Sequence, residues 1–125
     1  MNDIIYLSGP MNGYDNYNFD AFDMWADRLR ESGYVVLSPA ETAGGAQHLD
    51  RHWYFRFDFA IIATVNYVFL MPGWTESAGA KAEAIMACEM GIPLYELHEA
   101  DGSFLLVEVS DLSWGVEFKR GVEGL

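Results

Sequence analysis

The sequence predicts an α/β fold: a doubly wound parallel sheet of four or five strands in a flavodoxin-like, that is Rossmann-like, arrangement. Short apolar runs bounded by Gly or Pro alternate with longer stretches of helical periodicity. Strands separated by helices of this length pair in parallel through right-handed crossovers, with helices on both faces. The chain has 125 residues, of which 51% are hydrophobic, enough for one core. We therefore expect a three-layer α/β/α architecture.

The first half of the chain predicts a strand, a helix and a second strand. Residues 4–7 form a short apolar run closed by Ser-Gly-Pro. Apolar residues then recur at helical spacing from Asn18, and Gly33 stands where a helix commonly ends. Residues 34–37 predict the second strand, and a loop rich in Gly and Ala runs from there through Gln47.

The second half repeats this alternation. Residues 50–65 are aromatic and aliphatic over a length too great for one strand, which indicates a largely buried helix. Residues 67–71 predict a third strand, stopped by Pro-Gly. Ser77 is the expected N-cap of an alanine-rich helix that runs to about Met90. Residues 93–97 predict a fourth strand.

The pattern weakens beyond Glu99. Residues 104–109 favour a fifth strand, whereas Trp114 to Leu125 fit either a short helix or a tail. Because the chain contains no linker or internal repeat, we expect residues 1–125 to form a single domain, with residues 99–125 as its least defined part.

Composition and charge restrict the partners. Nineteen acidic against seven basic side chains give a formal net charge of -12, which disfavours DNA or RNA as a polymer. A single nucleotide stays compatible, because backbone N–H groups can hold one phosphate. The lone Cys88 permits no intrachain disulfide and is expected to be buried. No apolar run is long enough to span a membrane, so we expect a cytoplasmic protein.

Two loops are candidates for the binding site. In an open parallel sheet, ligands bind beyond the carboxyl ends of the strands, where the strand order reverses. The first and third strands flank that point in a flavodoxin-like order. The loops that follow them, residues 8–13 and 72–77, are both rich in glycine and in small or polar residues. Such loops let the backbone approach a ligand closely.

Glu83 is the first candidate catalytic residue. At 100° per residue it lies in the middle of the apolar face of its helix, on the side of Ala80 and Ala87. An unpaired ionised carboxylate on such a face is costly, although the positive end of the helix favours its charge. Glu83 is therefore either a structural acid that hydrogen-bonds a neighbouring loop or a functional one.

Asp58 is the second candidate, because it interrupts the apolar stretch FRFDFAII. The alternatives for Asp58 are an ion pair with Arg51 or Arg56, or a helix cap. Two acids with different roles are what glycosidic cleavage requires: one attacks the anomeric carbon, and the other protonates the leaving group and then activates the acceptor. This chemistry needs no cofactor, and the histidines show no metal-ligand spacing.

Several motifs, in their order and spacing, resemble the nucleoside 2-deoxyribosyltransferase superfamily. The motifs are IYLSGPMNG with YNFDAF after it, GYVVLSPAE, an Asp about eight residues before the third strand, and PGWTESAGAKAE followed by A-x-x-x-G-I-P. The resemblance covers about Ile4 to Leu94. This superfamily includes the transferases, the 2'-deoxynucleoside 5'-monophosphate N-glycosidases and many short phage and bacterial proteins.

The resemblance implies a role for each matching residue. PGWTESAGAKAE contains the family pattern Ser-x-Gly-x-x-x-Glu, which makes Glu83 the nucleophile, and Asp58 matches the second acid, which assists the leaving base. The remaining positions are implied substrate-binding residues: Ser8, Gly9, Pro10, Met11 and Asn12 in the first loop, Ser77 and Gly79 at sugar or phosphate, and Asn66. From its place in the second loop, Trp74 is expected either to stack on the base or cover the pocket, or to lie in the core or an interface.

Two positions depart from the family pattern. Asn66 stands where the family usually has Asp, which alters any hydrogen bond from that position to the substrate. Asn12 stands where the monophosphate hydrolases tend to have Arg, so phosphate binding would depend on loop N–H groups and Ser77.

The resemblance implies that the chain hydrolyses a 2'-deoxynucleoside 5'-monophosphate through a covalent sugar ester, giving free base and deoxyribose 5-phosphate. The alternatives are base exchange by a transferase, a nucleotide phosphoribohydrolase, and a non-catalytic nucleotide sensor. The phosphoribohydrolase is disfavoured because Trp74 replaces a Gly of its loop motif. The expected partners are a deoxynucleotide or deoxynucleoside and further copies of the chain, as a homodimer or higher homo-oligomer. Five aromatic residues predict core or subunit interface: Trp53, Tyr54, Phe55, Phe57 and Phe59.

Overall fold

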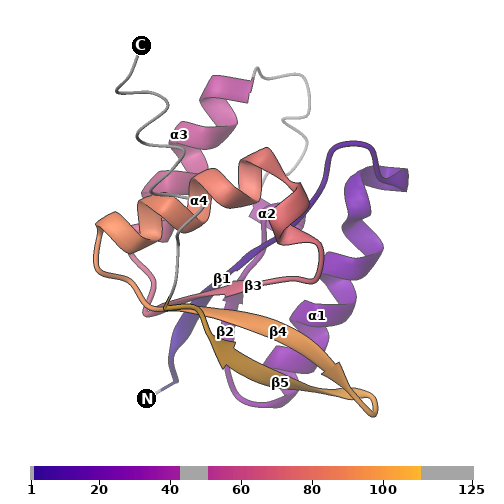
Figure 1. Ribbon diagram of the computed structural model, residues 1–125. Coiled ribbons are helices and arrows are strands. Elements are labelled where there is room, and N and C mark those ends of the chain that lie inside the picture. Colours follow the sequence, from indigo (N-terminus) through magenta and orange to yellow (C-terminus); the bar gives the residue numbers. More distant parts are fainter. Residues whose placement is uncertain (1, 43–50, 111–125) are drawn as a thin grey trace.

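The computed structural model describes residues 2–42 and 51–110 (Figure 1). The strands are β1 (Ile4–Ser8), β2 (Val35–Leu37), β3 (Tyr67–Leu70), β4 (Leu94–Ala100) and β5 (Ser103–Glu108). The α-helices are α1 (Phe19–Glu31), α2 (Pro39–Thr42), α3 (Arg51–Ile62) and α4 (Ala78–Glu89), and two 3-10 turns are η1 (Asp15–Asn18) and η2 (Trp74–Glu76). The Trp114–Leu125 segment, expected to be a helix or a tail, lies outside the described residues.

The five strands form one sheet in the order β2-β1-β3-β4-β5, which confirms the flavodoxin-like arrangement. β1 pairs in parallel with both β2 and β3, and β3 pairs in parallel with β4. The chain moves outward from β1 to β2 and then outward from β3 to β4, so the strand order reverses between β1 and β3. This is the position where a binding site is expected.

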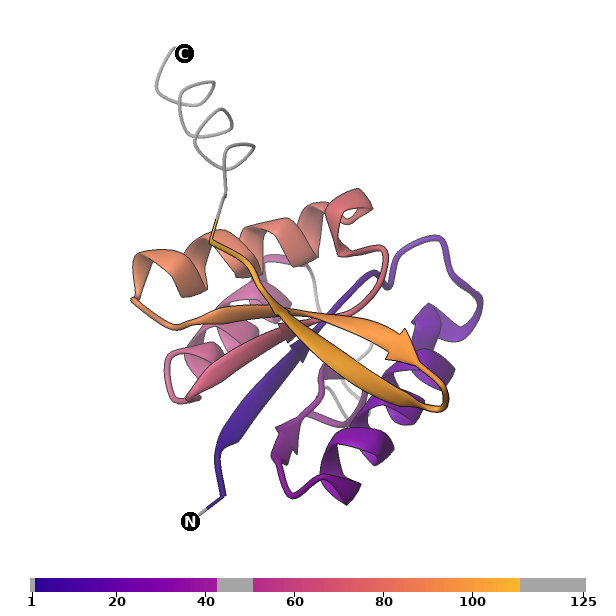
Figure 2. The same ribbon diagram turned by 60° about the horizontal axis from the view of Figure 1, so that its bottom comes forward.

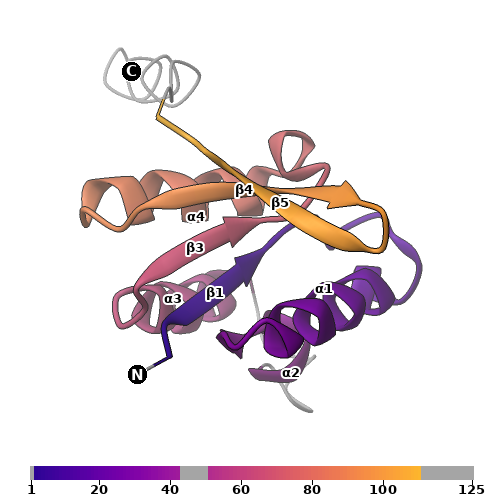
Figure 3. The same ribbon diagram turned by 90° about the horizontal axis from the view of Figure 1, so that it is seen from below.

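β5 departs from the parallel sheet predicted from the sequence, because it pairs antiparallel with β4. Asp101 and Gly102, with φ of 47° and 79°, form a two-residue turn between the paired residues Ala100 and Ser103. Such a turn makes a hairpin, whereas a parallel connection needs a crossover of a dozen or more residues. In Figure 3, β1, β3 and β4 run in one direction and β5 returns beside β4, and Figure 2 shows the hairpin from another side.

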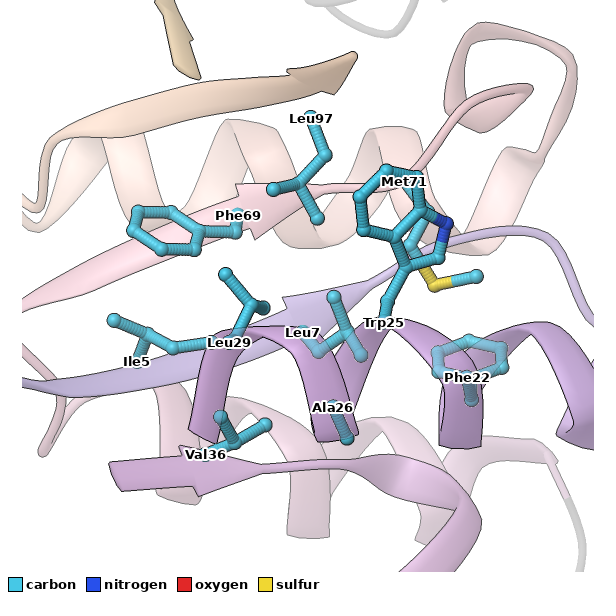
Figure 4. Packing of buried hydrophobic residues seen from close by; sticks show 10 residues of the cluster. All are labelled: Ile5, Leu7, Phe22, Trp25, Ala26, Leu29, Val36, Phe69, Met71 and Leu97. Carbon is cyan, nitrogen blue, oxygen red and sulfur yellow. The ribbon is translucent and has the colours of Figure 1, made fainter. Parts of the chain in front are cut away.

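Helices cover both faces of the sheet. α1 lies on one side, and α3 and α4 lie together on the other (Figure 1). Figure 4 shows the core beneath α1, where side chains of the helix meet those of the strands: Ile5, Leu7, Phe22, Trp25, Ala26, Leu29, Val36, Phe69, Met71 and Leu97. The opposite core holds Tyr6, Val68 and Leu70 against the alanines of α4. This doubly wound, three-layer arrangement is the predicted one.

Strand alternation in β1 determines which of its side chains reach the site. Ile5 and Leu7 belong to the core beneath α1, whereas Tyr6 belongs to the core beneath α3 and α4. Successive side chains of a strand point to opposite faces, so Ser8 lies on the same face as Tyr6. The two hydroxyl groups of β1 therefore face α4.

Some local expectations were wrong. α2 was predicted as loop, and Cys88 is exposed although it was expected to be buried. Within residues 2–42 and 51–110, no helix is long and apolar enough to cross a membrane.

Candidate active site

A cavity of about 520 Å³ lies at the carboxyl ends of β1 and β3. Its walls come from the loop after β1, from Pro39 after β2, from α3 and from the start of α4. The lining residues are Gly9, Pro10, Met11, Asn12, Tyr14, Tyr17, Phe19, Pro39, Tyr54, Phe55, Asp58, Glu76, Ser77, Ala78, Gly79, Ala80 and Glu83. Both Glu83 and Asp58 are among them, so the structure brings the two acids to one cavity.

Glu83 lies in the second turn of α4, and its side chain is only 6% exposed. Its two oxygens accept hydrogen bonds from different residues of β1. The Tyr6 hydroxyl donates to Oε2 at 2.7 Å, and the Ser8 hydroxyl donates to Oε1 at 2.7 Å. Hydroxyl donors at this distance to both oxygens stabilise an ionised carboxylate and fix its orientation.

Asp58 reaches the same group from α3. It lies close enough to Glu83 and Tyr6 to affect the pKa of both, and it is partly buried. The acid in the apolar stretch of α3 is thus paired with the other acid. The pKa of Tyr6 is raised well above its usual value, first by burial and then by the charges of Glu83 and Asp58.

Burial raises the pKa of both acids. The pKa of Glu83 rises to about 8, first through burial and then through the charge of Asp58, against the hydrogen bonds from Ser8 and Tyr6. The pKa of Asp58 rises to about 6, again mainly through burial. Because the groups are coupled, these values belong to the pair. Near neutral pH the pair therefore holds one proton and one negative charge, and the proton lies more often on Glu83, whose pKa is the higher of the two.

Close contacts shape the two loops. A Cβ on Gly9 would lie 2.9 Å from the Cβ and the Sδ of Met71, so glycine allows the loop after β1 to pass the end of β3. Ser77 caps α4, its hydroxyl accepting a hydrogen bond from the Ala80 N–H at 3.1 Å. Gly79 faces the ring of Phe55, and a Cβ on this glycine would lie 3.6 Å from that ring.

The loop before α1 carries aromatic residues to the cavity in an uncommon conformation. Asn16, Tyr17 and Asn18 all have positive φ, at 49°, 54° and 63°. The Asn18 amide donates to the Pro10 carbonyl oxygen at 2.9 Å, which ties this segment to the loop after β1. Left-handed backbone at non-glycine residues is costly and concentrates at functional sites. Here it places Tyr14 and Tyr17, both about half exposed, along the wall of the cavity.

Most of the substrate-binding residues expected from the sequence line the cavity. They are Gly9, Pro10, Met11, Asn12, Ser77 and Gly79. Ser8 does not line it: this residue is fully buried and contacts Glu83 from behind.

The structure does not bring Asn66 or Trp74 to the cavity. Asn66 precedes β3, at the opposite end of the sheet, where its Oδ1 accepts a hydrogen bond from the Ile4 N–H at 2.8 Å. Trp74 packs in the core under α4, and its Nε1 donates to Glu96 at 2.8 Å. The expected roles of Asn66 in substrate binding and of Trp74 as a stacking residue or lid therefore do not fit their positions.

Several residues at the site were not predicted for it. Tyr6 was missed, although its place two residues before Ser8 on one strand indicates the shared face. Tyr54 and Phe55 were expected in the core or in an interface but line the cavity, as do Tyr14, Tyr17 and Glu76. Among the residues that the structure describes, no group of three side chains suits a metal ion.

Comparison with known proteins agrees with this fold. A family model described as domain of unknown function (DUF4406) matches residues 3–96. No curated protein matches the sequence. A solved structure of a 2-deoxyribosyltransferase from Bacillus psychrosaccharolyticus superposes with a TM-score of 0.61, at 20% identity, over 74% of this chain and 70% of that chain. The resemblance seen in the sequence is thus confirmed for the fold.

Proposed function

The chain belongs to the DUF4406 family, and from its fold and its paired acids we propose that it breaks the N-glycosidic bond of a 2'-deoxynucleoside 5'-monophosphate. The observation that carries the proposal is the pair itself. Glu83 and Asp58 line one cavity, and Tyr6 and Ser8 donate hydrogen bonds to Glu83.

The first step starts from the form in which Asp58 holds the proton of the pair, and a carboxylate oxygen of Glu83 then forms a bond to C1' of the sugar. The C1'–N bond breaks, its electron pair goes to the base nitrogen, and Asp58 supplies the proton to the leaving base. The remaining negative charge beside C1' stabilises the positive charge that develops on the sugar.

In the second step, Asp58 takes a proton from water, whose oxygen then bonds to C1'. The Glu83–C1' bond breaks, and its electron pair returns to the carboxylate. The products are free base and deoxyribose 5-phosphate, and both acids regain their starting protonation states.

The start of α4 supports a phosphorylated substrate. Ser77, Ala78 and Gly79 line the cavity at the amino end of this twelve-residue helix, where backbone N–H groups and the helix dipole favour an anion. The Ser77 hydroxyl already accepts from the Ala80 N–H and keeps its own proton to donate.

Base exchange is the second candidate, supported by the 2-deoxyribosyltransferase that shares the fold. In this reaction a second base takes the place of water at the same sugar ester. A cavity with walls of Tyr14, Tyr17, Tyr54 and Phe55 is suited to stacking a base.

The test is incubation with each deoxynucleoside 5'-monophosphate and each deoxynucleoside, with and without a second base, followed by chromatography of free base. We expect base release from the monophosphate, and none from Glu83→Ala or from Glu83→Gln with an intact fold. Release only in the presence of a second base identifies the transferase, and binding without release identifies a nucleotide sensor. A Glu83→Gln variant with near wild-type turnover contradicts the proposal.

A further inference from the structure

Ser8 contributes to the site without lining the cavity. It ends β1, is fully buried and donates its hydroxyl to Glu83 Oε1 at 2.7 Å. In the part of the chain that the structure describes, the buried polar side chains are Ser8, Ser38 and Glu83. Two of these three are therefore hydrogen-bonded to each other.

The Ser8 hydroxyl is not needed for packing, and its role is the hydrogen bond to Glu83. The Ser8 backbone is held in the sheet, where it pairs with Leu70 and its carbonyl oxygen accepts from the Met71 N–H at 2.8 Å. Its paired residue Leu70, which belongs to the core on the same face as Tyr6, is apolar and fully buried. A small apolar residue would satisfy packing at this position, whereas a hydroxyl adds a single donor aimed at the carboxylate.

The hydroxyls of Ser8 and Tyr6 donate hydrogen bonds to different oxygens of the Glu83 carboxylate. Tyr6 donates to Oε2 and Ser8 donates to Oε1. Of these two donors, Tyr6 also lowers the pKa of Asp58, whereas Ser8 acts on Glu83. A donor of this kind favours the ionised form of the group that it contacts.

We propose that Ser8 is a positioning residue that orients the Glu83 carboxylate and favours its ionised form. Its catalytic consequence rests on the proposed function, whereas its effect on Glu83 does not. The same hydrogen bond stabilises the carboxylate that leaves C1' when the sugar ester breaks down.

The first test compares pH–rate profiles of the wild type, Ser8→Ala and Ser8→Cys, with Ser38→Ala as the matched control. Ser38 is also buried, and its hydroxyl accepts from the Ala40 N–H at 3.3 Å. Without the Ser8 donor the pKa of Glu83 rises further, so the acidic limb of kcat moves to higher pH. We expect kcat at neutral pH to fall about 10-fold, with KM nearly unchanged, in line with loss of one hydrogen bond to a charged group.

Ser8→Cys keeps a side chain of similar size with a weaker donor, so we expect an intermediate shift, and this variant tests the proposal if Ser8→Ala does not fold. Ser38→Ala should leave the profile in place. A Ser8→Ala or Ser8→Cys profile that coincides with the wild type overturns the proposal.

The second test does not depend on turnover. The Glu83 carboxyl carbon is followed by NMR of ¹³C-labelled protein across the pH range, and Glu83→Gln assigns the signal. We expect the titration of Glu83 to move to higher pH in Ser8→Ala and to stay in place in Ser38→Ala. An unchanged titration in Ser8→Ala overturns the role of Ser8. A shifted titration in a protein that releases no base supports that role and contradicts the proposed function instead.

Discussion

At the scale of single residues, the burial of Glu83 that the proposed reaction requires lowers the stability of the fold. Glu83 lies almost wholly out of water, and its hydrogen bonds from Tyr6 and Ser8 do not fully offset burial, because its pKa remains well above the ordinary value of 4.5. A neutral amide of the same shape would not carry this penalty. Groups that function demands in an unfavourable environment commonly reduce stability in this way.

Glu83→Gln should therefore stabilise the fold, and increasingly so at higher pH. The folded pKa of Glu83 is about 8 against 4.5 for the free side chain, so the folded state binds more protons between these values and the free energy of unfolding falls as pH rises. We expect the stability of Glu83→Gln relative to the wild type to grow by on the order of 3 kcal/mol between pH 5 and pH 8. Urea unfolding at both pH values measures it, and a difference independent of pH would contradict the raised pKa.

At the scale of the elements, the apolar pattern was sufficient to predict β1 to β4 and the three long helices. The order of the strands followed from the βαβ connections. The direction of β5 did not follow, because it depends on the two-residue turn at Asp101 and Gly102, which a weak strand pattern did not reveal. Chain reversal by two residues allows only the antiparallel neighbour.

The site was predicted in part for the same reason. Glu83 and the residues of the two loops could be placed because strand ends and helix faces have fixed geometry. Trp74 could not, since its loop turns through η2 and directs the indole into the core instead of the cavity. Asn66 lies at the amino end of β3, whereas the cavity lies at the carboxyl end, so its position next to the strand in sequence did not indicate a place in the site.

The close approach of the loop after β1 to the end of β3 gives a prediction for Gly9. In Gly9→Ala the new Cβ would meet the Met71 Cβ at 2.9 Å, a contact that rotation of the Met71 side chain does not relieve. We expect a loss of about 1–3 kcal/mol in the free energy of unfolding, as for other overpacked sites. The double variant with Met71→Gly removes that Cβ and provides the control. Thermal and urea unfolding measure both, and if the penalty of Gly9→Ala is the same in the Met71→Gly background, its cause is not this contact.

At the scale of the whole molecule, the charge distribution opposes a phosphorylated substrate. The chain has a formal net charge of -12, and the cavity is lined by Asp58, Glu76 and Glu83. No lysine, arginine or histidine occurs among the cavity-lining residues of the described part of the chain. The amino end of α4 is then the positive element for a phosphate, and Glu76 lies directly beside it, one residue before the Ser77 cap.

Salt should therefore affect the phosphorylated and unphosphorylated substrates differently. Screening weakens the repulsion between a phosphate dianion and the acidic surface, so kcat/KM for a deoxynucleoside 5'-monophosphate should rise about 3-fold from 50 to 500 mM NaCl, while kcat/KM for the neutral deoxynucleoside stays nearly constant.

Glu76→Gln removes the acid nearest to the start of α4. It should raise kcat/KM for the monophosphate about 5-fold at low salt, as expected for one unit charge a few ångströms away in water, and by less at high salt. Glu89→Gln, an exposed acid at the far end of the same helix, is the matched control and should change neither substrate. Steady-state kinetics with both substrates at both salt concentrations tests both predictions. If salt changes kcat/KM equally for the two substrates, the acidic surface does not repel the bound phosphate. The substrate would then bind with its 5' end away from Glu76.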